Sequence, residues 1–220
     1  MDFSIYESPF TFRYGSDKMR QIFSEKHKFE LWRKIWVSLA TVEYQAGLVS
    51  KKELEDIQKN ETNINIERVL EIEKETRHDV VAAIKEFAEK ATIGGGKIHL
   101  GATSMDIVDN ADMLRIHEAI RVIKDRVSKV LISLTDKIEK YADFLCLGYT
   151  HLQPAEPTTM GYRLAFSAQD LFNALHFLKF AEKQIKGKGI KGAVGTGASY
   201  KEMLSSHKMM VDELERKVMG

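Results

Sequence analysis

A long run of apolar residues at helical spacing follows Thr103 and limits the possible folds more than any other feature of the sequence. Thr103 and its partner three residues on, Asp106, mark the start of a helix. Between Ile107 and Tyr141, apolar side chains recur at steps of three and four residues, which places them on one face of this α-helix. At 1.5 Å per residue such a helix is about 55 Å long, several times the average length. Other long helices must cover a face of this length. We therefore expect an all-α fold that contains a bundle of long helices.

Capping and stop residues predict shorter helices in the first hundred residues. No proline lies between Pro9 and Pro154, so the strongest helix breaker is absent from this region. The predicted helices are 17–46, capped by Ser16 or Asp17 and stopped by Gly47; a short helix after the capping box of Ser50 and Glu53; 66–75; and 80–91, with Asp79 as its cap.

The triple glycine at 94–96 interrupts this pattern and indicates a domain boundary. We expect a small N-terminal helical domain over residues 1–100 and the first part of a central long-helix bundle domain over residues 101–220. Two bundle helices and part of a third leave large apolar faces without partners in the chain. The chain is therefore expected to be the front portion of a longer protein.

Two further helices are predicted in the second domain. One follows the proline loop at 154–157 and ends at the glycines 187–189. The next begins near Ser199 or Tyr200 and runs to the end of the chain. The glycine-rich segment 192–197 between them lacks the spacing of a dinucleotide-binding loop, and we interpret it as a flexible turn.

Charge and cysteine content exclude several classes of function. The 33 Lys and Arg residues nearly balance the 32 Asp and Glu residues, and no long block of one sign occurs, which argues against a nucleic-acid-binding or membrane-binding surface. One cysteine, Cys146, permits no internal disulfide, and no Cys/His cluster has zinc-site spacing. The chain starts without a signal-peptide pattern, and charges interrupt every window long enough to span a bilayer. A soluble cytoplasmic protein is expected.

Three histidines lie at loops or helix starts, where functional residues are common. His78 lies in T-R-H-D-V, His99 in K-I-H-L-G-A-T-S and His151 in T-H-L-Q-P-A-E-P-T-T. The other four histidines lie inside predicted helices, and we assign them no role.

Each of these motifs has a chemical and a structural interpretation. Segment 77–79 (Arg-His-Asp) suits anion binding beside an oriented imidazole, or it is a helix-capping cluster. Segment 101–104 offers hydroxyls and free N–H groups at a helix start for a carboxylate or phosphate, or it is an ordinary N-cap. His151 is flanked by the polar side chains of Thr150 and Gln153 and is a candidate proton donor, or it is a structural turn residue.

Taken together, the three motifs resemble the adenylosuccinate lyase family of the fumarase/aspartase superfamily. The string H-L-G-A-T-S-M-D-I-V-D-N at 99–110 carries the resemblance, with the other two motifs before and after it. The similarity runs from Arg13 to Ser199 and covers about the first half of a family subunit. It implies β-elimination of fumarate from adenylosuccinate, giving AMP, and from the succinylated carboxamide ribotide of purine biosynthesis, with no metal or organic cofactor.

The resemblance also implies roles for single residues. His151 is the acid that protonates the leaving nitrogen, and His78 supports His151 or binds substrate. Arg13 and Tyr14 are expected to contact the nucleotide phosphate. The remaining pocket residues implied by the family are Arg77, Asp79, His99, Thr103, Ser104, Thr150 and Gln153.

One family element is absent. The catalytic base is a serine in a loop of the pattern G-S-S-x-M-P-x-K-x-N-P, and no such string occurs between Met1 and Gly220. We therefore expect the 220-residue chain alone to show no cleavage.

Family members share each active site among subunits of a homotetramer, and the uncovered face of the long helix agrees with this. The alternatives are another lyase of the superfamily, with a different succinyl or fumaryl substrate, and a non-catalytic helical scaffold.

Overall fold

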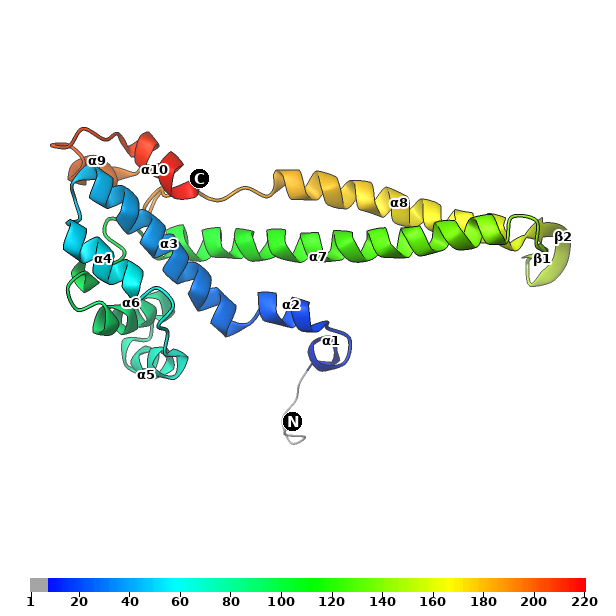
Figure 1. The fold of residues 1–220 in the computed structure, drawn as a ribbon, viewed down its shortest axis with the longest axis horizontal. Helices are drawn as coiled ribbons and strands as arrows, with labels where there is room; N and C mark the ends of the chain where they lie inside the picture. Colours follow the sequence, from blue (N-terminus) through cyan, green and yellow to red (C-terminus); the bar gives the residue numbers. More distant parts are fainter. Residues whose placement is uncertain (1–7) are drawn as a thin grey trace. The chain divides into compact units, whose positions relative to one another are not determined.

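The computed structural model describes residues 8–220, which form two compact units. Unit 1 combines the described residues up to Arg115 with Gly187–Gly220, and unit 2 is Ile116–Lys186. The elements, in chain order (Figure 1), are α1 (Pro9–Phe12), α2 (Asp17–Ile22), α3 (Glu25–Ala46), α4 (Lys51–Lys59), α5 (Ile66–Thr76), α6 (Asp79–Lys90), the 3-10 helix η1 (Gly95–Lys97), α7 (Ser104–Lys140), β1 (Leu145–Thr150), β2 (Gln153–Thr159), α8 (Met160–Gln184), α9 (Ala198–Met203) and α10 (Val211–Met219).

The expected all-α class is confirmed, with one small antiparallel hairpin added. The predicted long helix is confirmed as α7, which begins in unit 1 and continues into unit 2. The expected domain boundary at residue 100 concerns the whole protein and stays a prediction.

The single helix predicted for 17–46 is wrong, because the chain breaks at Ser24. The Ser24 hydroxyl donates to the carbonyl of Gln21 at 2.8 Å and accepts from the backbone N–H of His27 at 3.2 Å. A serine that bonds the backbone on both sides competes with helix continuation, so α2 ends and α3 begins there. The predicted stop at Gly47 is confirmed, with a φ of +86°.

Helix capping was predicted well at one position and wrongly at another. The capping box of Ser50 and Glu53 is present at the start of α4. Helix α6 is capped by His78 and not by Asp79, because the His78 Nδ1 accepts from the backbone N–H of Val81 at 3.5 Å. Asp79 is instead the first residue of the helix, and its Oδ1 accepts from the N–H of Val80.

Unit 1 has a closed core on both sides of α3. One cluster is built around Trp32, Trp36 and Phe87, which are at most 1% exposed. The second joins Leu39 and other residues of α3 to the C-terminal segment, where the buried residues are Ile190, Tyr200, Leu204, Met209 and Leu214.

The helix predicted to run from Ser199 or Tyr200 to the chain end is wrong. The structure has two short helices, α9 and α10, separated by residues 204–210. The hydroxyl of Ser205 donates to the carbonyl of Glu202 at 2.7 Å, which again draws the backbone out of the helix.

Unit 2 is a helical hairpin in which α8 runs back beside α7 from the β1–β2 turn (Figure 1). Helix α8 ends at Gln184, before the predicted stop at 187–189. The strands were not predicted, because Pro154 and Pro157 argue against a strand. A two-stranded hairpin tolerates them: Pro157 pairs with Leu147 and Pro154 pairs with Tyr149, and the register is irregular between Leu147 and Tyr149.

Candidate active site

The backbone conformation singles out the three histidine motifs. Every non-glycine residue with a positive φ in the described part of the chain lies in one of them: Arg77 at +55°, His99 at +68°, His151 at +48° and Leu152 at +63°. Positive φ is uncommon for residues with a side chain, and such strain is concentrated at functional sites. The structure thus marks the same three segments as the sequence, by an independent property.

Two of these motifs meet in unit 1, where the first turns of α6 and α7 lie together. The His78 Nε2 is 3.5 Å from the hydroxyl oxygen of Ser104. His78 Nδ1 accepts from Val81, so a neutral ring carries its proton on Nε2 and directs it at Ser104. A charged ring would instead pair through Nδ1 with Asp79, 3.4 Å away. The exposed His78 side chain is therefore available to a ligand in either state.

The His99 side chain is hydrogen-bonded to a residue of the hydrophobic core. The indole nitrogen of Trp36 donates to the Nδ1 of His99 at 3.0 Å. Burial lowers the pKa of His99 to about 4, His78 acts in the same direction, and the carboxylate of Asp106 opposes both. His99 is therefore neutral at physiological pH.

Asp106 was predicted only as the polar partner of Thr103, and the structure gives it a larger role. Its carboxylate is fully buried and accepts from the backbone N–H of Thr103 at 3.0 Å, which confirms that pairing. It also accepts from the N–H groups of Lys191 and Gly192 at 3.1 and 3.0 Å, and Lys188 Nζ lies 3.4 Å away. One carboxylate thus joins the start of α7 to the segment that follows α8.

Asn110, one turn further along α7, makes a second set of hydrogen bonds to the segment that follows α8. Its side-chain amide exchanges hydrogen bonds with the backbone of Gly189, at 3.0 and 3.2 Å. The hydroxyl of Ser199 donates to the carbonyl of Gly101 at 2.7 Å. The glycine-rich segment interpreted as a turn is therefore held against residues 101–110, a contact that no local sequence signal indicated.

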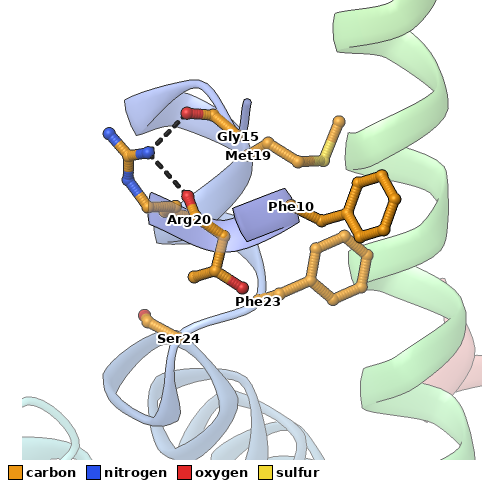
Figure 2. A pocket seen from close by; sticks show the side chains of 7 residues that line it. Phe10, Gly15, Met19, Arg20, Phe23 and Ser24 are labelled. Atoms are coloured by element: carbon orange, nitrogen blue, oxygen red, sulfur yellow. Dashed lines mark hydrogen bonds between the residues drawn. The ribbon is translucent and has the colours of Figure 1, made fainter. Parts of the chain in front are cut away.

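The N-terminal pair Arg13 and Tyr14 lies elsewhere in unit 1, and both side chains are exposed. The Arg13 guanidinium is 5.9 Å from the ring centre of Phe12, and the Tyr14 ring is 6.4 Å from that of Phe10. Neither lines the nearby cavity of about 400 Å³. In that cavity Arg20 bonds the backbone carbonyls of Thr11 and Gly15 (Figure 2), and the lining residues are Phe10, Thr11, Gly15, Met19, Arg20, Phe23 and Ser24.

His151 lies in unit 2, at the tip of the β1–β2 hairpin. Thr150 and Gln153 pair across the strands, so His151 and Leu152 form a two-residue turn in which both φ angles are positive. Turns of this kind usually need Asn or Gly at these positions. Leu152 is 95% exposed and His151 is also exposed. The hairpin therefore presents a histidine to solvent on a strained backbone, next to Thr150 and Gln153.

Within residues 8–220 no group of three or more His, Cys, Asp or Glu side chains is arranged to hold a metal ion. None of the helices described is both long and apolar enough to cross a membrane.

The helical architecture and the three motifs define a class of protein that comparison with known sequences identifies. A family profile described as lyase matches residues 11–220, and the chain belongs to this lyase family. Among curated relatives, the adenylosuccinate lyase of Methanocaldococcus jannaschii is 41% identical over 94% of this chain and 46% of its own length. The adenylosuccinate lyase of Saccharomyces cerevisiae is 35% identical over 99% of this chain and 46% of its own length. The chain thus spans about half the length of the curated relatives it matches.

Solved structures share the fold at lower identity. A fumarate lyase from Mesorhizobium sp. BNC1 matches with a TM-score of 0.83 and 24% identity, over 97% of this chain and 48% of that one. A 3-carboxy-cis,cis-muconate lactonizing enzyme from Pseudomonas putida matches with a TM-score of 0.81 and 24% identity, over 95% and 48% of the two chains. At this identity the similarity supports the fold alone.

Proposed function

We propose that the chain is the amino-terminal part of an adenylosuccinate lyase. The reaction breaks the C–N bond of adenylosuccinate by β-elimination, and it releases fumarate and AMP. The succinylated aminoimidazole carboxamide ribotide of purine biosynthesis is the second substrate. The observation that carries the proposal is that all described positive-φ residues other than glycine lie in the three histidine motifs that resemble this family.

The chemistry needs a base, an acid and a site for the developing charge. A base removes a proton from the succinyl carbon next to a carboxylate, and an acid protonates the leaving nitrogen, so no net proton is gained or lost. We assign the acid to His151, whose exposed position at the hairpin tip suits contact with a substrate. His78, with its Nε2 toward Ser104, supports it or binds substrate.

The other proposed contacts include groups that bind the phosphate and carboxylate groups of the substrate. Arg13 and Tyr14 are proposed to bind the nucleotide phosphate, and both are exposed as this requires. Backbone N–H groups at a helix start attract carboxylate and phosphate groups, and Thr103 and Ser104 lie at the start of α7. The pocket is completed, in this proposal, by Arg77, Asp79, His99, Thr150 and Gln153, without a metal or organic cofactor.

Unit 2 leaves large hydrophobic side chains exposed, and these concern the oligomeric state of the protein. Large hydrophobic residues such as Phe166 and Phe177 are 68% and 74% exposed. We propose a cytoplasmic homotetramer in which other subunits cover these residues and complete each active site. The division into an N-terminal domain over 1–100 and a bundle domain over 101–220 belongs to the same proposal.

Ligand-induced stabilisation tests the proposed substrate. Adenylosuccinate at one hundred times its Kd is expected to add ~2.7 kcal/mol and raise the Tm by about 5–10 °C. His78→Gln should reduce this rise, whereas His176→Gln, at an exposed histidine outside the motifs, should not. Stabilisation by argininosuccinate instead would favour another lyase of the superfamily, and no response to either would favour a scaffold.

Turnover gives a second test. Because the family's serine loop is absent from residues 1–220, we expect no fumarate release by the chain alone. Measurable release that His151→Ala abolishes would contradict this expectation and would require a base within the chain.

A further inference from the structure

Trp36 makes a polar contact that its place in the hydrophobic core does not require. It lies on α3, is 1% exposed, and donates its indole N–H to the Nδ1 of His99 at 3.0 Å. The two rings also contact edge to face, with centroids 6.1 Å apart and planes at 80°. An indole N–H can only donate, so the Nδ1 of His99 holds a lone pair and no proton. A neutral His99 ring then carries its proton on Nε2.

We propose that Trp36 is a positioning residue that fixes His99 as the neutral Nε2–H tautomer, so that His99 always offers a hydrogen-bond donor to an oxygen of the bound ligand. This inference rests on the proposed function, because the succinyl carboxylates and the phosphate supply such oxygens. In the described part of the chain, the Nε2 of His99 has no hydrogen-bond partner, so it is free to donate.

The surroundings of His99 keep the ring in this state. His78, at the start of α6, disfavours a positive charge on His99, and Asp106, on α7, favours it. Burial outweighs the effect of Asp106, and the pKa is lowered to about 4. The backbone is fixed as well, since His99 has a φ of +68° and its carbonyl accepts from the N–H of Ala102 at 3.2 Å. Charge, tautomer and backbone of this residue are thus set before any ligand arrives.

Trp32 provides a matched control on the same helix. It lies one turn before Trp36, is equally buried, and packs against it with ring centroids 6.2 Å apart. Its indole nitrogen is buried without a hydrogen-bond partner. Substitution by phenylalanine therefore removes a bonded N–H at Trp36 and an unbonded one at Trp32, with a similar change of volume.

Nitrogen NMR of the full 220-residue chain, with ¹⁵N-labelled histidine, tests the tautomer directly. His99 is identified by the signal lost in His99→Gln. The wild type should show an unprotonated Nδ1 and a protonated Nε2, and it should stay neutral well below pH 6. Trp36→Phe should give a mixture of tautomers, whereas Trp32→Phe should leave the spectrum of His99 unchanged. A proton on Nδ1 in the wild type, or an unchanged tautomer in Trp36→Phe, would overturn the proposal.

A measurement on the wild type alone covers the case in which Trp36→Phe does not fold. A scalar coupling across the hydrogen bond should connect the indole nitrogen of Trp36 to the Nδ1 of His99. Absence of this coupling would overturn the proposal without any variant.

Binding of adenylosuccinate, measured by calorimetry, separates this inference from the proposed function. Trp36→Phe should weaken binding by about two- to tenfold, because only the fraction with the proton on Nε2 is competent. In a His99→Gln background, Trp36→Phe should have no further effect, since an amide has no tautomers. If the wild type binds adenylosuccinate but Trp36→Phe leaves the affinity unchanged, this inference fails alone. If the wild type does not bind it, the proposed function fails, and the tautomer is still decided by NMR.

Discussion

The two units of the chain use their aromatic residues in opposite ways. In unit 1, Trp32, Trp36 and Phe87 pack together and are at most 1% exposed. In unit 2, Phe166 and Phe177 on α8 remain largely exposed, and the buried residues are Ala119 and Gly161. Both units have helical spacing of apolar residues, so spacing alone does not distinguish a core that the chain closes itself from a face that needs a partner.

Charged residues show the same contrast. Arg33 and Glu86 form an ion pair in unit 1 that is almost fully buried, and the Arg33 guanidinium also lies 3.5 Å from the ring centre of Phe87. In unit 2, Lys124 pairs with Glu182 at a more exposed position on the hairpin. Unit 1 therefore depends on interactions from which water is excluded, whereas unit 2 does not.

Matched truncations of phenylalanine should give the largest difference between the units. Phe87→Ala leaves a cavity in a closed core and removes the ring under Arg33, so we expect a loss of about 3–5 kcal/mol in the free energy of unfolding. Phe177→Ala should change it by about 0.5 kcal/mol or less in dilute protein. Urea unfolding of both variants measures this. A Phe177→Ala loss that grows with protein concentration would show that another copy covers this residue.

The pH dependence of stability should come from unit 1, where Glu43 is fully buried on α3 with no partner for either carboxylate oxygen. Burial raises its pKa to about 9, against a weaker opposing effect of Lys97. Between the unfolded pKa near 4.5 and pH 9 the folded state binds one more proton than the unfolded state, so stability falls as the pH rises.

Glu43→Gln should remove this dependence. Between pH 6 and 8 we expect the wild type to lose about 2.6 kcal/mol relative to the variant. Glu30→Gln, at an exposed glutamate of the same helix, should keep the wild-type slope. Parallel slopes for the wild type and Glu43→Gln in urea unfolding would contradict the assignment.

A smaller loss of stability is expected for a substitution at Gly161, where the helical hairpin of unit 2 is tightly packed. A Cβ on Gly161, at the start of α8, would lie 2.7–2.8 Å from backbone atoms of Ile138, Tyr141 and Ala142. We expect Gly161→Ala to destabilise this end of the hairpin by about 1–2 kcal/mol, measured by amide hydrogen exchange at the end of α7. Gly96→Ala, where no atom lies within 4 Å, is the control and should leave that exchange unchanged.

The smallest effect is expected for the ion pair of Lys124 and Glu182 in unit 2, which is partly exposed to solvent. Lys124→Met should weaken stability slightly, and the difference should decrease at high salt, because ion pairs that solvent reaches are screened. Thermal unfolding at low and high ionic strength checks this. A large loss that salt does not reduce would mean that the pair is buried in the assembled protein.

The sequence predicted helices and local caps better than it predicted where helices break. Gly47 and the Ser50–Glu53 box act through neighbouring backbone groups, so their signals are local and were correct. The breaks at Ser24 and Ser205 were missed because a serine is compatible with both a helix and a cap, and local sequence does not decide between them.

The candidate site was predictable where residues are adjacent in sequence and not where they come together through folding. The three motifs were found because each contains its polar groups within a few residues. The contact of Trp36 with His99, and those of Asp106 with Lys191 and Gly192, join residues 63 to 86 positions apart. No spacing rule connects such residues, although an acidic residue three positions after Thr103 did indicate one contact of Asp106.

The return of residues 187–220 to unit 1 has a consequence for synthesis on the ribosome. Leu39 and the rest of that face of α3 are covered by Tyr200 and Leu214, which are translated after the whole of unit 2. At 5–20 residues per second the delay is on the order of 10–30 s. During this interval the nascent chain exposes an apolar face, so chaperone binding to growing chains should be concentrated before Leu214 emerges.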